Sequence, residues 1–537
     1  MTDNDALLEQ CLKKFLLYDN IRPGHLQGFK EIIQGRDVIL NYPLGDGKTR
    51  TSLSATIHNK NAEVLVIVPL RVLRIEWEKE ILNLGGYPAT DYNSFLTNEK
   101  PKYLIICPEK LLSSLTKYLK EKDDEKKYIW THKFTNCIFD EVHIKAINFR
   151  KKSYLAAKSF IRKRKRMQFT GLTATIDDDT VSCIKKETKR KKLKRILGST
   201  NLLRHINIYV IDTACHTKDK SYKSIVDGLI KKSKASKCLY FLNSIKRCEN
   251  VESNLLENAI CITTINSNST SRELSELMVS TNGVTLATTS LACGYNDKLY
   301  NYGVIRGIFK PEDTAQMIGR FYRGRHTNSN FNDSNEKDGF MDNLVVLLYN
   351  ITMLKDIIKL TLKIKNSNKK HDLIISYVKT FIMLKNPMGI CIQKLFEQHF
   401  YGANATNNEN CGRCNFCKMT NRPTTPFSIS GKSIRQELGK VQEKNNLNGK
   451  KNSFEEMAKI LTKALKIKKQ IANFAMFKFV AAQVMVLDLD NNNNIIWRLS
   501  INKIIDKYSD EHFDVKYMDI NHKEVDVETI VKEFKKS

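Results

Sequence analysis

The chain contains no run of 18 apolar residues, and its first ten residues are acidic and lack a signal-peptide pattern. The sequence therefore predicts an intracellular protein with no membrane partner. Disulfide-type cysteine spacing is also missing, because nine of the 13 cysteines are scattered among apolar neighbours and only four cluster. This distribution excludes a disulfide framework and favours a reducing compartment with one metal site.

Acidic residues are in short supply, since 58 Asp and Glu stand against 88 Lys and Arg and the formal net charge is +30. Such an excess indicates a polyanionic partner, and nucleic acid is favoured over anionic lipid because no membrane anchor is visible. Base bias in a genome is the alternative origin, and the asparagine run Asn491–Asn494 is consistent with it. The basic runs Arg162–Arg166 and Lys185–Arg195 are typical of solvated faces or connectors, with nuclear localisation as the other interpretation.

Short apolar runs alternate with amphipathic segments over residues 1–200, which is the pattern of a parallel α/β sheet. The expected strands have the sequences RDVILNY, EVLVIVP, KYLIICP and NCIFDE. A second α/β region is expected over 201–348, with strands KCLYFLN, AICITTI, GVTLATT and YGVIRGI and a polar loop at Asn328–Asp338. Residues 349–422 should be helical around the cysteine cluster, and 423–537 should form a short α+β tail.

Two patterns stand out in that tail. Ser453-Phe454-Glu455-Glu456 has the form of a capping box that opens a helix, and VMVLDLDNNNNIIWRLSI predicts two strands around a polar turn. A helix followed by a hairpin is typical of the end of a small winged helix, with Trp497 near the wing. A plain hairpin with a core tryptophan is the alternative.

A glycine-containing loop follows the first expected strand and precedes a helix-compatible segment. Its sequence is Tyr42-Pro43-Leu44-Gly45-Asp46-Gly47-Lys48-Thr49. Glycines let backbone N–H groups approach phosphate oxygens, and a following helix N-terminus adds a favourable dipole. The pattern predicts that Lys48 contacts the β- and γ-phosphates of a nucleotide and that Thr49 binds Mg²⁺. Tyr42 replaces the first glycine of the strict pattern, and a plain glycine turn is the alternative.

Two further segments carry side chains suited to nucleotide hydrolysis. Asp140 follows an expected strand and can complete the Mg²⁺ site, while Glu141 can orient and deprotonate the attacking water. In the second α/β region, Gln316 precedes Arg320 and Arg323, which lie one helical turn apart and can reach a γ-phosphate between two lobes. A surface acidic pair and a solvated basic helix are the alternatives for each segment alone. The occurrence of all three motifs in one chain favours a nucleotide site.

The order and spacing of these motifs resemble those of superfamily 2 helicases, and specifically the RecQ family, over roughly residues 15–420. IVPL and CPEKL resemble the strand-binding motifs Ia and Ib, LTAT resembles motif III, and FLNS and ATTSLACGYN resemble motifs IV and V. The resemblance implies two RecA-like parallel-sheet lobes that use ATP and Mg²⁺ to move 3′ to 5′ along single-stranded DNA.

The resemblance also assigns contacts to the nucleotide. It places adenine near Tyr18 and Arg22, with His25 at the position of the family's adenine-binding glutamine and Gln27 close by. The remaining contacts fall on the glycine-containing loop, at Pro43, Leu44, Gly45, Asp46, Gly47, Lys48 and Thr49.

The segment after His143 departs from the family, because it is shorter than the family's aromatic-rich loop and has no tryptophan. Phe149 and Arg150 are expected to retain part of its strand-sensing role, since aromatic and guanidinium planes stack on bases. A core position for Phe149 is the alternative.

Cys391 lies twenty residues before a C-x₂-C-x₂-C cluster formed by Cys411, Cys414 and Cys417. This spacing brings three thiolates within reach of one ion, and a fourth thiolate completes a closed tetrahedral site. An iron–sulfur cluster is the alternative. RecQ proteins carry a helical zinc-binding subdomain at this place, so the resemblance favours structural Zn²⁺ on these four cysteines.

The sequence therefore predicts an ATP-dependent 3′–5′ DNA helicase of RecQ type, with single-stranded DNA and forks as partners in repair, recombination or replication. An RNA helicase or a remodelling translocase is one alternative, and a zinc-stabilised nucleic-acid-binding protein with an impaired ATPase is another. The expected location is the nucleus or another site of DNA replication, or a cytoplasmic factory for a viral protein. The sequence makes no prediction of oligomeric state.

Overall fold

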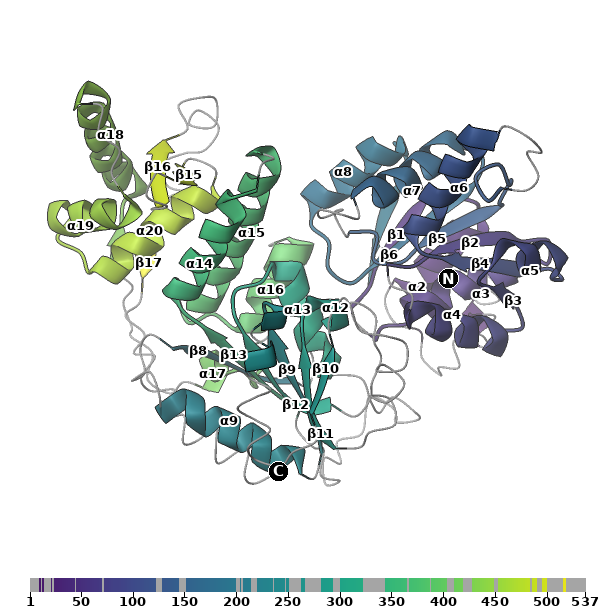
Figure 1. Cartoon of the computed structure of the whole chain (residues 1–537), viewed down its shortest axis with the longest axis horizontal. Helices are drawn as coiled ribbons and strands as arrows, with labels where there is room; N and C mark the ends of the chain where they lie inside the picture. The colour runs from purple at the N-terminus through teal and green to yellow at the C-terminus, as the bar shows by residue number, and fades with distance from the viewer. Residues whose placement is uncertain are drawn as a thin grey trace. The chain divides into compact units, whose positions relative to one another are not determined.

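Figure 1 shows the computed structural model of the chain. The structure describes residues 9–10, 12–13, 21, 24–43, 45–69, 72–121, 128–143, 151–198, 203, 206–213, 220–234, 236–246, 248–250, 262–265, 282–292, 300–321, 343–364, 367–386, 388–402, 410–418, 427–448, 453–482, 485–489, 495–499 and 515–517. None of the helices among these residues combines the length and apolarity that crossing a membrane requires.

The chain divides into two compact units. The first comprises Met1–Arg204 together with Leu291–Asp297 and Glu397–Asn408, and the second comprises His205–Ser290, Lys298–Phe396 and Glu409–Ser537. The predicted end of the first lobe at residue 200 stays a prediction.

The first unit is built on a seven-stranded parallel sheet (Figure 1). Its strands, in spatial order, are β3 (Tyr87–Ala89), β4 (Lys102–Ile106), β2 (Glu63–Ile67), β5 (Asn136–Phe139), β6 (Gln168–Thr173), β1 (Val38–Asn41) and β7 (Lys194–Leu197). Its helices are α2 (His25–Ile33), α3 (Lys48–Ile57), α4 (Val72–Asn83), α5 (Tyr92–Thr97), α6 (Pro108–Glu121), α7 (Lys151–Lys163) and α8 (Asp178–Thr188).

Helices cover both faces of this sheet, which explains why its central strands read as continuous apolar runs. Ile39 of β1 belongs to one hydrophobic cluster together with Phe160 of α7, whereas Val38 and Leu40 belong to a second cluster with Leu53 of α3. Successive side chains of a strand point to opposite faces, so a strand covered on both sides needs apolar residues at every position.

The second unit contains a six-stranded parallel sheet. Its strands, in spatial order, are β10 (Ile262–Ile265), β11 (Gly283–Ala287), β9 (Lys237–Leu242), β12 (Tyr300–Arg306), β13 (Asn343–Tyr349) and β8 (Ile206–Asp212). Helices α9 (Lys220–Ser233) and α13 (Pro311–Ile318) accompany it, and α12 (Thr289–Ala292) follows β11 across the division at Ser290. The two parallel sheets confirm the predicted α/β fold class, and all eight predicted strands are present. The predicted loop at Asn328–Asp338 lies outside the described residues.

The region after β13 is helical, as predicted. It contains α14 (Ile351–Leu362), α15 (Ser367–Lys385), α16 (Ile392–Tyr401) and the short α17 (Asn415–Lys418). The tail adds α18 (Gly431–Asn448), α19 (Phe454–Ala464), α20 (Lys469–Ala481) and the antiparallel pairs β14 (Phe427–Ile429) with β17 (Val515–Tyr517) and β15 (Met485–Leu489) with β16 (Ile495–Leu499).

The two patterns read from the tail sequence are confirmed. Glu456 N–H donates to Ser453 Oγ at 3.2 Å and Ser453 N–H donates to the Glu456 carboxylate at 2.8 Å, which completes the capping box. The predicted hairpin is β15–β16, and Ser453 also forms an antiparallel bridge with Ile496.

Helix α20 packs against α15 and α19 through buried aromatic side chains. The ring of Phe477 lies 4.7 Å from that of Phe454 in α19 and 5.5 Å from that of Phe381 in α15. Phe474 and Phe479 of α20 are also buried. The tail is therefore joined to the helical region through an apolar interface rather than by a flexible tether.

Candidate nucleotide and metal sites

The glycine-containing loop connects β1 to α3 in the first unit. Gly45 and Gly47 have φ values of 75° and 79°, a region that glycine enters without the steric cost of a Cβ atom. Helix α3 begins at Lys48, and its first turn has neither a side-chain cap nor an acidic residue. The first turn thus carries no acidic side chain of its own, which suits binding of a phosphate.

Lys48 is held over this loop. Its Nζ donates to the carbonyl oxygens of Tyr42 and Pro43, each at 3.1 Å. Thr49 follows in the same turn of α3 and is half-buried. The structure thus brings together the residues predicted to contact phosphate and Mg²⁺. Leu44 lies outside the described residues.

The loop is supported from beneath by the start of α2. His25 is fully buried, and its Nε2 lies 2.6 Å from the carbonyl oxygen of Asp46. Tyr42 is also fully buried, and its hydroxyl donates to the carbonyl of Gly24 at 2.8 Å. The tyrosine that replaces the strict pattern's first glycine thereby fastens the loop to α2.

The predicted adenine contacts have different outcomes. His25 contacts the loop and has no exposed surface in this structure, whereas Gln27 is exposed on α2. Tyr18 and Arg22 lie outside the described residues. Assignment of adenine to these residues stays a prediction.

Asp140 and Glu141 follow β5. Burial, followed by the negative charge of Glu141, raises the pKa of Asp140 to about 6. A hydrogen bond from Trp77 and the positive charge of Lys48 act in the opposite direction. Lys48 and Asp140, 92 positions apart in the sequence, therefore interact electrostatically in the folded unit, as a shared phosphate and Mg²⁺ site requires.

Glu141 adopts a conformation that few non-glycine residues occupy, with φ 49°. Its N–H donates to Asp140 Oδ1 at 3.0 Å, and its carboxylate lies 3.3 Å from Nδ1 of His143. His143 Nδ1 is 2.7 Å from Oγ1 of Thr173, the last residue of β6. Such a backbone conformation costs about 1–3 kcal/mol and persists where surrounding contacts fix it. The segment resembling motif III is thus linked to the acidic pair through His143.

Trp77 is a residue of this site that the sequence did not single out. Its indole Nε1 on α4 donates to Asp140 Oδ2 at 3.1 Å, and the side chain is 2% exposed. One turn further along α4, Glu80 accepts two hydrogen bonds from Arg50 of α3, at 2.9 Å and 3.4 Å. Helix α4 therefore contacts both the acidic residue and the helix that follows the loop.

Trp77→Phe is expected to raise the Mg²⁺ concentration needed for half-maximal ATP hydrolysis by about tenfold, because loss of a partner that orients a metal ligand commonly weakens metal binding by 10–100-fold. The indole lowers the pKa of Asp140, so its loss lets that pKa rise. The carboxylate is lost as the pH falls through its pKa, so the defect should grow as the pH is lowered towards about 6. Mg²⁺ titrations of ATPase activity at several pH values measure both effects.

Trp130→Phe is the matched control, since Trp130 is also buried in the first unit but packs against Phe160 instead of Asp140. An unchanged Mg²⁺ requirement in Trp77→Phe, or an equal change in the control, would contradict the positioning role of Trp77.

In the second unit, Gln316 is buried in α13, which ends at Ile318. Arg320 lies in the 3₁₀ turn Gly319–Phe321 and is 3% exposed. This turn is seated by Phe321, whose ring occupies the space beside Gly303 of β12, since a Cβ atom at that glycine would lie 1.9 Å from the ring. Arg323 lies outside the described residues, as do Phe149 and Arg150 of the segment after His143.

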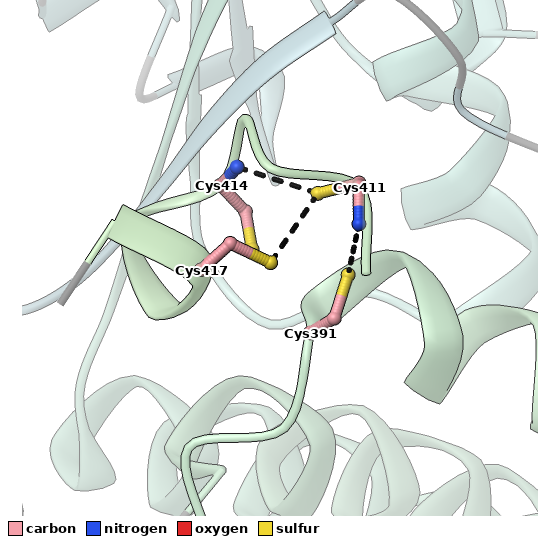
Figure 2. A group of neighbouring side chains, drawn as sticks. All are labelled: Cys391, Cys411, Cys414 and Cys417. Carbon is pink, nitrogen blue, oxygen red and sulfur yellow. Dashed lines mark hydrogen bonds between the residues drawn. The ribbon is translucent and has the colours of Figure 1, made fainter. Parts of the chain in front are cut away.

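The four clustered cysteines converge in the second unit (Figure 2). Their sulfur atoms lie within 4.8 Å of one another, with Cys411 and Cys417 at 3.7 Å and Cys414 and Cys417 at 3.4 Å. Tetrahedral zinc with Zn–S bonds of about 2.3 Å places its sulfurs about 3.8 Å apart. Four cysteine sulfurs at this spacing fit a closed zinc site. Hydrogen bonds among them, that from Cys411 foremost, lower the pKa of Cys391, and those involving Cys391 raise the pKa of Cys414 and Cys417.

Two backbone N–H groups support the sulfurs. The N–H of Cys411 donates to Cys391 Sγ and that of Cys414 donates to Cys411 Sγ, both at 3.4 Å (Figure 2). Gly412, between them, has φ 67°, which allows the chain to turn tightly around the sulfurs. The backbone of this loop therefore turns so that its N–H groups can stabilise charge on the sulfurs of Cys391 and Cys411.

The cysteine cluster is also fastened to the edge of the second sheet. The side-chain amide of Asn415 accepts from the N–H of Val210 at 3.1 Å and donates to its carbonyl at 3.2 Å. Lys418 donates to the hydroxyl of Tyr209 at 2.9 Å. Both contacted residues belong to β8, the edge strand, so Asn415 satisfies backbone groups that another strand would otherwise pair.

Comparison with known proteins gives a family match within the first unit. Residues 22–183 match the model of the DEAD/DEAH box helicase family. This match identifies a DEAD/DEAH helicase domain in the first unit and indicates an ATP-dependent nucleic-acid helicase. It does not distinguish the RecQ family from other superfamily 2 helicases.

Solved helicase structures show similarity at low sequence identity. S. cerevisiae Dbp5 bound to RNA and ADP BeF3 has a TM-score of 0.44 and 14% identity, covering 67% of this chain and 92% of that chain. The Mycobacterium smegmatis helicase Lhr bound to ssDNA and AMP-PNP has a TM-score of 0.46 and 14% identity, covering 74% and 55%. Mss116p bound to ssRNA and AMP-PNP has a TM-score of 0.49 and 15% identity, covering 71% and 82%.

Proposed function

We propose that this chain is a RecQ-type DNA helicase that couples ATP hydrolysis to 3′–5′ movement on single-stranded DNA and to duplex unwinding. The helicase-domain match provides the motor, and the observation that carries the finer assignment is the convergent four-cysteine site on β8. That site lies at the place in the chain where the RecQ resemblance puts a zinc-binding subdomain.

The residues of the first unit have distinct roles in this proposal. Lys48 and the N-terminus of α3 would bind the phosphates, and Thr49 and Asp140 would hold Mg²⁺. Mg²⁺ held there would neutralise phosphate charge during transfer to water. Glu141 accepts the proton of the attacking water, and its unusual backbone conformation fixes its carboxylate beside His143.

Arg320 and Arg323 are proposed to stabilise the charge that develops on the transferred phosphate. The buried position of Arg320 beside the Phe321 anchor supports a defined side-chain position. Positioning of this kind is what an electrostatic role in hydrolysis needs, because a mobile cation must be ordered before it can stabilise a transition state.

Zn²⁺ on the four cysteines is proposed to be structural. A closed Cys₄ site has no open position for water, so bound zinc supplies folding free energy rather than chemistry. Asn415 couples the zinc site to β8, because it lies between two of the cysteines and forms hydrogen bonds with the backbone of that strand.

The tail is proposed to form a small winged helix. Its support is the order of α18, the bridging Ser453, α19, α20 and the β15–β16 hairpin. Since α20 is buried against Phe381 and Phe454, insertion of that helix into a DNA groove is not part of the proposal. The hairpin and α18 remain the surfaces through which the tail would contact duplex.

An unwinding assay on matched DNA and RNA forks with opposite overhangs tests the proposal. We expect ATP- and Mg²⁺-dependent unwinding of the DNA fork with a 3′ overhang, and no unwinding by Lys48→Ala. Preference for the RNA fork would replace the DNA assignment with an RNA helicase, and a 5′ overhang requirement would overturn the polarity. Binding without hydrolysis or unwinding would indicate a protein with an impaired motor.

A further inference from the structure

A group of exposed cations lies at the end of the first sheet where its strands begin. We call it the basic edge, and it consists of Arg162, Lys163, Lys165, Arg166, Lys189, Lys191 and Lys192. These residues flank the turns that precede β6 and β7, and both strands pair with β1. The two turns therefore lie side by side, at the edge where these three parallel strands begin.

The predicted nucleotide site lies at the opposite end of the strands, where they end. The loop at Gly45 follows the end of β1, and Asp140 follows the end of β5. The six residues of β6 separate the edges by about 20 Å at about 3.3 Å per residue. The basic edge consequently has no part in binding or hydrolysing ATP.

The nearby carboxylates already have partners outside the basic edge. Asp37 pairs with Arg190 and Glu187 pairs with Lys158. Glu31 pairs with Arg36 and Lys194. Within the part of the chain that the structure describes, none of the seven cations of the basic edge forms an ion pair, so their charge is available to a partner.

Arg190 fixes the two turns against each other. Its guanidinium is 7% exposed and donates to both carboxylate oxygens of Asp37 at 2.9 Å. It also donates to the carbonyl of Arg164 at 2.6 Å, which joins the turn before β7 to the turn before β6. Arg164 in turn packs 3.6 Å from the ring centroid of Phe160. Arg164 and Arg190 thus make contacts within the folded unit that hold the two turns together.

The composition of the basic edge selects the class of partner. Single-strand sites combine cations with aromatic side chains on which bases stack. Here Trp130 and Phe160, the aromatic residues beneath Lys163 and Arg164, are buried. A surface of exposed cations, with no exposed aromatic side chain among the residues that the structure describes there, fits a phosphate backbone whose bases are already paired.

We propose that the basic edge binds the backbone of duplex nucleic acid, independently of base sequence and of the nucleotide site. The inference deepens the proposed helicase function, because it gives the first lobe a second surface that holds the duplex while the motor acts on a single strand. It also assigns Arg162–Arg166 and Lys185–Arg195 a role other than nuclear localisation.

The test compares two variants with the same loss of charge. Lys165→Gln/Lys191→Gln/Lys192→Gln alters the basic edge, and Lys79→Gln/Lys359→Gln/Lys363→Gln removes three exposed lysines elsewhere. Binding of a blunt DNA duplex and of a single-stranded oligonucleotide is measured by fluorescence anisotropy over a salt series, without nucleotide. We expect the basic-edge variant to lose about three units of the salt slope for the duplex, since each phosphate contact contributes about one. Its duplex affinity should fall at least about tenfold, with single-strand binding retained.

An unchanged duplex slope, an equal loss in the control variant, or a loss confined to the single strand would each overturn the inference. Thermal melting of both variants shows whether the fold is retained. Because the binding assay needs no ATP, failure of the proposed function would appear separately, as absent fork unwinding by a wild-type protein that still binds duplex through the basic edge.

Discussion

Lys48→Ala is expected to reduce the rate of ATP hydrolysis by at least about 10²–10³-fold while leaving binding to single-stranded nucleic acid measurable. Removing one electrostatic stabiliser of a transition state typically has an effect of this size. Lys48 is placed for that role at the start of α3, above the loop whose carbonyls it contacts and near enough to Asp140 to lower its pKa. Steady-state ATPase assays with and without DNA measure the effect.

Two further variants separate chemistry from folding. Lys48→Met keeps the length of the side chain but removes the charge, so it should be as inactive as Lys48→Ala. Lys79→Ala removes an exposed lysine of α4 and should hydrolyse ATP at the wild-type rate. Hydrolysis by Lys48→Ala at the wild-type rate would show that ATP is bound elsewhere, and the assignments of Thr49, Asp140 and Glu141 would fall with it.

The central strands could be predicted because each is covered on both faces and therefore reads as an apolar run. β8 and β13 carry the same signal in INIYVID and NLVVLLY, although neither is among the eight predicted strands. β6 and β7 are different, since QFTGLT is largely polar and KRIL is half basic. These two strands pair on either side of β1, and Arg195 of β7 donates to the side chain of Asn41 at the end of β1. Their pairing depends on tertiary contacts that a local pattern does not contain.

In the candidate site too, some residues could be predicted from a local pattern, whereas others depend on tertiary contacts. Motif spacing predicted Lys48 and Asp140 because phosphate and metal chemistry demand those residue types. It could not identify Trp77, whose role depends on a contact with a residue 63 positions away. Nor could it show that His25 lies beneath the loop, because a histidine at that position is equally compatible with an adenine contact.

Cys414→Ser is expected to remove bound zinc and to lower the free energy of unfolding of the second unit by at least about 3 kcal/mol. Zinc binding contributes about 10–16 kcal/mol in isolated zinc-finger peptides, and a site that loses one of four ligands keeps only part of that. A loss of 3 kcal/mol corresponds to roughly 6–12 °C in melting temperature for a domain of 150–250 residues, and the shift should be smaller in the larger second unit. Metal analysis and thermal melting of the full chain measure the two effects.

The loss should reach beyond the cysteine loop, because Asn415 and Lys418 fasten that loop to β8. A loop released from the metal leaves the backbone groups of Val210 at a sheet edge without their Asn415 partner, which adds the cost of unsatisfied buried groups to the loss of the ion. Proteolysis should therefore cut Cys414→Ser near β8 sooner than the wild type. Asn415→Ala separates the contributions, since it should keep the metal and lose only part of the stability.

Cys183→Ser is the matched control, because Cys183 is a half-buried cysteine on α8 of the first unit, outside the cluster. It should retain about one zinc per chain and melt near the wild-type temperature. Iron in the wild-type protein would replace zinc with an iron–sulfur cluster as the occupant of the four cysteines. A wild-type protein without a stoichiometric amount of metal would leave the sulfur positions unexplained. It would also remove the observation on which the proposed RecQ-type function depends.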